Sequence, residues 1–269
     1  FQAEDGIRDR SPSRGLGDVY KRQHYRLSGE RGPWLILHPP FILDHECWDM
    51  SGFVQLLERD FRLMLIDPLG HGRSDAPEDP TCYSMESRVQ DVLNVMQEVQ
   101  MDFAHFFGVG LGGQVGFQMA VDAPRKIRSL ITAAAHPYPR LDEIKTLEEA
   151  LVQLRSGNIQ NYLQQWRSEE HLSLEQQENI LKGNPQSQAI GLEACCRWEG
   201  VADQLESINI SSLLFTCTSE PSFLSVCEAG RRLKYGRYVI LPKIVFSHGL
   251  WSTETIVEPM LDFIRKLRS

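Results

Sequence analysis

The sequence predicts one α/β domain with a mostly parallel sheet, helices on both faces and an inserted helical cap. From residue 24 onward, short apolar runs alternate with amphipathic segments, the pattern of strands joined by crossover helices. An apolar run at 104–107 leads into a glycine-rich turn at 108–113 and then into a helical segment. Residues 142–207 interrupt the alternation with helical sequence rich in Glu and Gln, which predicts a cap over the strand ends.

Composition limits the classes of function. A net charge of −8 argues against a nucleic-acid binder that works by neutralising phosphates. No apolar run approaches the roughly 18 residues of a membrane span. The six cysteines form no C-x-x-C pair and have no zinc-type spacing, so we expect reduced core thiols. We therefore expect a cytoplasmic monomer or homodimer that holds no metal or organic cofactor and binds neither nucleic acid nor membrane.

Residues 1–23 have a different character from the rest of the chain. They are polar, lack periodicity and contain no apolar segment typical of a signal peptide. This stretch closely resembles the translation of a sequencing adapter, a contaminant found at the ends of metagenomic gene sequences. We therefore expect residues 1–23 to be an artefactual leader, and the native N-terminus and first strand to be missing.

The core is expected to occupy 24–141 and 208–269. Ser84 is a candidate N-cap, because apolar residues then recur on one helical face through Met96. The strands are expected at 24–27, 34–37, 62–66, 104–107, 127–134, 213–217 and 238–241. The helices are expected at 48–57, from residue 84, at 114–121, 223–233 and 253–267, with cap helices at 146–154, 159–166, 174–181 and 187–196.

The turn at 108–113 has the setting of a nucleophile elbow, G-x-S-x-G, in which a strained strand-to-helix turn presents a serine. Gly108 and Gly112 occupy the two positions that require small residues. The nucleophile position, however, is Gly110, which has no side chain and cannot form an acyl-enzyme. The adjacent residues Val109 and Leu111 are also chemically inert.

Several motifs in order resemble the α/β-hydrolase superfamily over about 24–269, and most closely its 3-oxoadipate enol-lactonase-like branch. His38 stands where the family has His-Gly at the end of a strand. The other matching segments are Asp44-His45-x-x-Trp48, Asp67-x-x-Gly70-His71-Gly72-x-Ser74-Asp75, and Ala104-His105-Phe106-Phe107-Gly108 before the elbow. The resemblance implies a serine, a histidine base, an acid that orients the histidine, and two N–H donors for the oxyanion.

The acid and histidine positions depart from the family pattern. Glu220 corresponds to the family aspartate, although a solvated charge before Pro221 is the alternative. Counting from Pro242 without gaps places Phe246 on the histidine position. His248 lies two residues later and reaches that position only with a compensated loop insertion.

The oxyanion hole is altered as well. The Leu111 N–H is retained, but the second donor position is Pro40, which has no N–H. Phe41 substitutes for it if the loop carries one extra residue. His136, at the end of the strand after the elbow, is a candidate pocket residue, with a capping or solvent role as the alternative.

Three functions are consistent with these residues. The first is a catalytically impaired family member that acts by ligand binding or interaction, with a small apolar or ester-like ligand as its expected partner. The second is an active esterase or lactonase-type serine hydrolase in which Gly110 is a sequence error. The third is a histidine-based, non-nucleophilic enzyme that uses His248 and Glu220.

Overall fold

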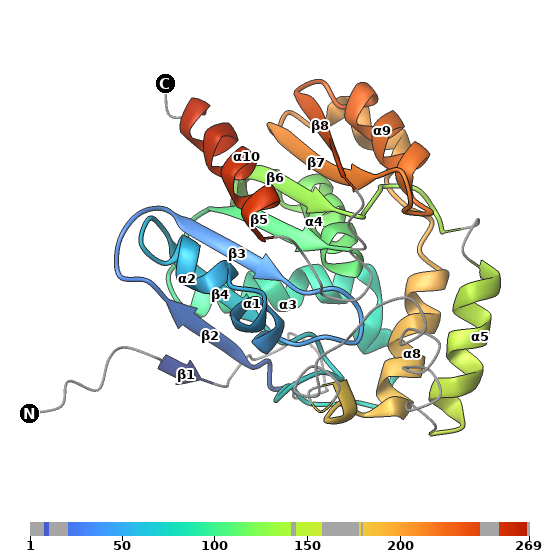
Figure 1. Ribbon diagram of the computed structural model, residues 1–269. Coiled ribbons are helices and arrows are strands. Elements are labelled where there is room, and N and C mark those ends of the chain that lie inside the picture. The colour runs from blue at the N-terminus through green and yellow to red at the C-terminus, as the bar shows by residue number, and fades with distance from the viewer. Residues whose placement is uncertain are drawn as a thin grey trace, which may run out of the picture.

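The computed structural model describes residues 8–10 as backbone and residues 21–140, 144–157, 178, 180–242 and 253–267. It shows an eight-stranded sheet in the order β1-β2-β4-β3-β5-β6-β7-β8 (Figure 1). The strands are β1 (Arg8–Arg10), β2 (Tyr25–Ser28), β3 (Trp34–His38), β4 (Arg62–Ile66), β5 (Ala104–Val109), β6 (Ile127–Ala133), β7 (Ser212–Cys217) and β8 (Gly236–Leu241). β2 pairs antiparallel with β1 and β4, and every pair from β4 to β8 is parallel. The predicted α/β fold is thereby confirmed.

Both faces of the sheet are covered because its strands are apolar on both sides. On β3, Leu35 and Leu37 face one core and Ile36 faces the other. α1 (Glu46–Met50), α2 (Phe53–Leu57) and α10 (Thr253–Lys266) cover the first face. α3 (Met85–Glu98), α4 (Leu111–Asp122) and α9 (Phe223–Arg232) cover the second (Figure 1).

One expected helix is divided. The segment expected as a single helix at 48–57 forms α1 and α2, separated by Ser51 and Gly52. Gly52 has φ +80°, a conformation that a continuous helix does not allow. Short 3₁₀ helices also occur as η1 (Pro80–Tyr83), η2 (Pro124–Lys126) and η4 (Ala202–Ser207).

The described part of the expected cap contains α5 (Ile144–Arg155) and α8 (Pro185–Cys196), which pack against each other. An Arg155–Glu193 ion pair joins the two helices. Arg88 of α3 holds α8 to the core by donating to the Gly191 carbonyl at 3.3 Å. The helix expected at 159–166 and most of that at 174–181 lie outside the described residues, so the cap boundaries 142–207 stay a prediction.

The N-terminal segment makes contacts that its sequence did not predict. β1 adds to the sheet edge beside β2, and Lys21 pairs with the Asp91 carboxylate at 3.4 Å. Backbone pairing at a sheet edge requires no particular side chains, which explains why composition gave no sign of it. The adapter origin of residues 1–23 stays a prediction.

The cysteines and the helices of this fold agree with the composition of the chain. All six cysteines are free and five are buried, with Cys196 the exposed one, in agreement with reduced core thiols. Among the described residues, no helix combines the length and the apolar character that crossing a bilayer requires.

Candidate functional site

The turn between β5 and α4 has the strained geometry expected of a nucleophile elbow. Gly110 has φ +52° and ψ −117°, a backbone conformation that L-residues with a side chain rarely adopt. Its N–H donates to the Ala133 carbonyl at 2.9 Å, and its carbonyl accepts from the Gln114 N–H at 3.1 Å. The elbow conformation is therefore kept although the nucleophile is missing.

The glycines of the turn are required for different reasons. A Cβ on Gly108 would lie 2.3 Å from the Gly112 carbonyl oxygen, and one on Gly112 would lie 2.3 Å from the His38 carbonyl oxygen. By contrast, a Cβ on Gly110 would meet only the Pro40 Cβ among the described residues, at an ordinary 3.6 Å. Packing thus enforces glycine at 108 and 112, whereas at 110 it leaves room for a side chain.

Pro40 lies directly against the nucleophile position. It follows the end of β3 at His38, which is where the resemblance places the second oxyanion donor. Proline has no N–H, so this residue gives no hydrogen bond to an oxyanion. Leu111 begins α4, and the first N–H groups of a helix have no partner within the helix. One donor is therefore retained, and the role of Phe41 stays a prediction.

His71 fixes the loop that carries Pro40. The Ile42 N–H donates to His71 Nε2 at 3.0 Å, and His71 Nδ1 donates to the Leu69 carbonyl at 2.9 Å. Because one ring nitrogen accepts and the other donates, His71 is a neutral imidazole. Burial lowers the pKa of His71 to about 4, which keeps it neutral at physiological pH.

His38 and His136 are both buried near the strand ends. Burial lowers the pKa of His38 to about 3, and its Nδ1 lies 3.1 Å from the Pro39 carbonyl oxygen. The Tyr138 N–H donates to His136 Nδ1 at 3.3 Å, and the two rings lie 5.8 Å apart. His136 is thus held by its own loop, and its role as a pocket residue or a cap stays a prediction.

Glu220 is buried, at 8 % exposure, in the turn after β7. Its N–H donates to the Cys217 carbonyl and its own carbonyl accepts from the Phe223 N–H, which fixes the backbone of the turn. This burial contradicts the solvated-charge alternative for Glu220. Both candidates for the histidine position, Phe246 and His248, lie outside the described residues, so their relation to Glu220 stays a prediction.

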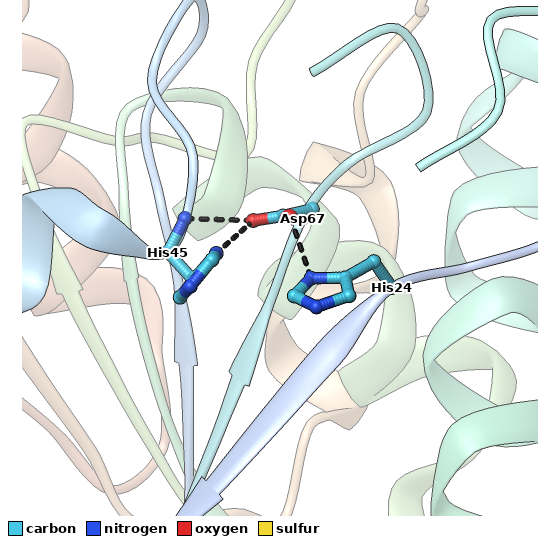
Figure 2. Close-up of side chains that lie close together, drawn as sticks. All are labelled: His24, His45 and Asp67. Atoms are coloured by element: carbon cyan, nitrogen blue, oxygen red, sulfur yellow. Dashed lines mark hydrogen bonds and ion pairs between the residues drawn. The ribbon is translucent and has the colours of Figure 1, made fainter. Parts of the chain in front are cut away.

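A cluster that sequence reasoning missed joins three segments beside the site (Figure 2). The Asp67 carboxylate lies 2.7 Å from the Nδ1 atoms of both His24 and His45. It also accepts from the N–H groups of His45 and Arg73, at 2.8 and 3.0 Å. Burial alone would raise the pKa of Asp67, but the hydrogen bonds from both imidazoles outweigh it and hold this pKa well below its usual range.

This cluster has the composition of a metal site, but its hydrogen bonds indicate a structural role. Two histidines and a carboxylate are a common ligand set for metals. Each Asp67 oxygen, however, already accepts two hydrogen bonds, which fills the lone-pair directions of the carboxylate. A Cβ on Gly72 would lie 2.3 Å from Asp67 Oδ2, so the glycine of the loop makes room for this carboxylate. Asp67 therefore anchors the loop.

Asp44 adds a second buried carboxyl next to this cluster. Burial and the neighbouring Asp67 charge raise the pKa of Asp44 to about 6. The pKa of Asp67 is therefore lowered and the pKa of Asp44 is raised, although the two carboxyls are neighbours. The sequence signal was an aspartate with a nearby histidine in both 44–45 and 67–72, but this pattern did not reveal which side chains pair.

A family model described as the alpha/beta hydrolase fold matches residues 33–189, a segment that includes the elbow and the loops around it. This chain belongs to the α/β-hydrolase family. A putative 2-succinyl-6-hydroxy-2,4-cyclohexadiene-1-carboxylate synthase of Bacillus subtilis is 24% identical over 71% of this chain and 76% of its own length. A putative carbamate hydrolase, RutD, of Stutzerimonas stutzeri is 28% identical over 52% of this chain and 53% of its own length.

Solved structures support the same fold. The enol-lactonase of Burkholderia xenovorans superposes with a TM-score of 0.77 at 22% identity, covering 91% of this chain and 97% of the enzyme. An esterase of Thermogutta terrifontis superposes with a TM-score of 0.80 at 16% identity, covering 97% of this chain and 100% of that one. At these identities the likeness shows the fold alone, because one fold hosts many unrelated activities.

Proposed function

We propose that this protein is a catalytically impaired α/β-hydrolase family member that binds a small apolar or ester-like ligand beneath its cap. One observation carries the proposal: the elbow keeps its strained geometry, but the position it presents is Gly110, with Pro40 packed against it. The scaffold for a serine is therefore present without the atom that would attack an ester.

The two alterations remove separate contributions to catalysis. Losing the nucleophile of a catalytic triad typically costs on the order of 10⁶ in turnover. Losing one oxyanion donor, as Pro40 implies, costs about 10²–10³ more. Both changes impair the same reaction. Two such changes together support a genuine loss of ester cleavage, whereas a sequence error would have altered position 110 alone.

The test is an assay of the purified chain with p-nitrophenyl acetate and with an enol-lactone. Both substrates should hydrolyse at the rate measured in buffer alone. A product-like carboxylic acid or a non-hydrolysable ester analogue should nevertheless bind saturably in calorimetry. Turnover above background that His248→Ala abolishes would contradict the proposal, and so would a failure of all such ligands to bind.

An active serine hydrolase is a second candidate, favoured by the room at position 110. An ordinary 3.6 Å contact with Pro40 would accommodate a serine Cβ. Resequencing codon 110 decides between the two, because a serine codon would restore the nucleophile. Labelling of that protein by a fluorophosphonate would then establish a reactive serine.

The buried position of Glu220 supports a third candidate, histidine-based chemistry with His248. A carboxylate within about 3.2 Å of the imidazole would orient and activate it as a base. Turnover that is lost on both Glu220→Gln and His248→Ala, without covalent labelling, would identify this mechanism.

A further inference from the structure

A cavity of about 580 Å³ lies between the cap and the core, away from the elbow. Its lining residues come from α8 and the segment that follows it up to η4, and from η1, the start of α3 and the end of α4. The α4 residues that line it are Gln118, Val121 and Asp122, eight to twelve positions after Gly110. At 1.5 Å per helical residue this places the cavity about 12–18 Å from the elbow.

The cavity lining includes several apolar side chains and one indole ring. Trp198 is 8 % exposed and donates its indole N–H to Gln118 Oε1 at 2.8 Å. Because its one polar atom is engaged, the ring presents carbon atoms to the cavity. The other apolar lining side chains include Met85 of α3, Val121 of α4 and Ile190 of α8.

The rim of the cavity is acidic. The lining carboxylates are Glu86, Asp122, Glu193 and Glu199, and Arg197 is the one basic residue among the lining side chains of the described chain. Of these four, Glu193 is paired with Arg155.

Asp122 is linked to Trp198 by hydrogen bonds through Gln118. Gln118, which accepts from Trp198, donates its amide to both Asp122 oxygens at 3.0 and 3.1 Å. The indole and the carboxylate are thus positioned by the same buried amide. An aromatic surface and a fixed negative charge therefore occur side by side in one cavity.

We propose that this cavity binds organic cations with an aromatic or apolar body, of the aryl-alkyl ammonium class. The apolar body would pack on the Trp198 ring, and the cationic group would lie among the rim carboxylates. A cation near an indole face gains further attraction from the ring quadrupole. The site does not depend on what the elbow does, so it stands or falls separately from the proposed function.

Three matched probes test the charge preference: 2-phenylethylammonium, 2-phenylethanol and phenylacetate, titrated by calorimetry at low ionic strength. The expected order of affinity is ammonium, then alcohol, then carboxylate. Raising the salt concentration should weaken the ammonium complex selectively, because the rim charges are solvent-accessible. Equal affinities for the three probes, or no saturable ammonium binding up to about 10 mM, would overturn the proposal.

A pair of double variants locates the binding. Glu86→Gln with Glu199→Gln removes two exposed rim charges and should weaken ammonium binding about tenfold, which corresponds to about 1.4 kcal/mol. The matched control is Glu254→Gln with Glu258→Gln, which removes two exposed charges from α10 on the opposite face of the sheet. The control should leave affinity unchanged, and equal weakening in both pairs would refute the assignment of this cavity.

Discussion

Replacing Gly110 with alanine tests whether the elbow is strained and whether position 110 has room. The φ of +52° and ψ of −117° are costly for any residue with a Cβ, by about 1–3 kcal/mol. No clash adds to this, since the nearest described atom would lie at 3.6 Å. We expect Gly110→Ala to lower the free energy of unfolding by that strain alone, or to lower Tm by about 2–4 °C per kcal/mol.

Two other glycines calibrate the measurement. Gly108→Ala would place a Cβ 2.3 Å from a backbone oxygen, so it should cost clearly more than Gly110→Ala. Gly52→Ala has φ +80° with no described atom within 4 Å, and should cost about 1 kcal/mol. Urea denaturation of the three variants gives the ranking. Equal costs at 108 and 110 would refute the claim of room at 110, and a neutral Gly110→Ala would refute the strained elbow.

The remaining predictions concern the loops around the elbow. Asp67→Asn should lower the free energy of unfolding by about 3–5 kcal/mol in urea, because an amide N–H₂ would face groups that donate to the carboxylate; a loss below about 1 kcal/mol would contradict its anchoring role. His71→Ala should cost about 2 kcal/mol or more by leaving the Ile42 N–H without its acceptor, and an unchanged urea midpoint would exclude this. The pKa of Asp44 is raised from 3.8 to about 6 in the folded state. The contribution of protonated Asp44 to the free energy of unfolding is therefore fully present below pH 3.8 and is lost as the pH rises through 6. Asp44→Asn should therefore gain on the wild type by up to about 3 kcal/mol between pH 4 and pH 7.5, and a pH-independent difference would contradict the raised pKa. In a Gly110→Ser background, Pro40→Ala restores an N–H and should raise ester hydrolysis about 10²-fold over Gly110→Ser alone, whereas no gain would contradict the role assigned to Pro40.

The sequence predicted the parallel sheet because its strands are apolar on both faces. Residues such as Leu35, Ile36 and Leu37 form a run with no polar face, which is typical of a strand covered by helices on both sides. The elbow was predictable for a related reason, since the close approach of β5 to α4 excludes any Cβ at Gly108 and Gly112. Both constraints act on single positions or short runs, so the residue types at those positions reveal them.

The Asp67 cluster was not predictable in the same way. His24 and His45 lie 43 and 22 positions before Asp67, and only the folded sheet brings the three side chains together. The split between α1 and α2 was missed because apolar periodicity continues across Gly52, whose positive φ interrupts the helix. The placement of Pro40 beside position 110 likewise depends on how the loop after β3 folds back on the elbow.

The most direct test of the central claim is intact-mass analysis of the wild-type chain after exposure to a fluorophosphonate. Codon 110 is confirmed first, and Gly110→Ser serves as the comparison protein. We predict no covalent adduct on the wild type, because the elbow presents no hydroxyl. A stoichiometric wild-type adduct that His248→Ala abolishes would contradict the loss of the nucleophile.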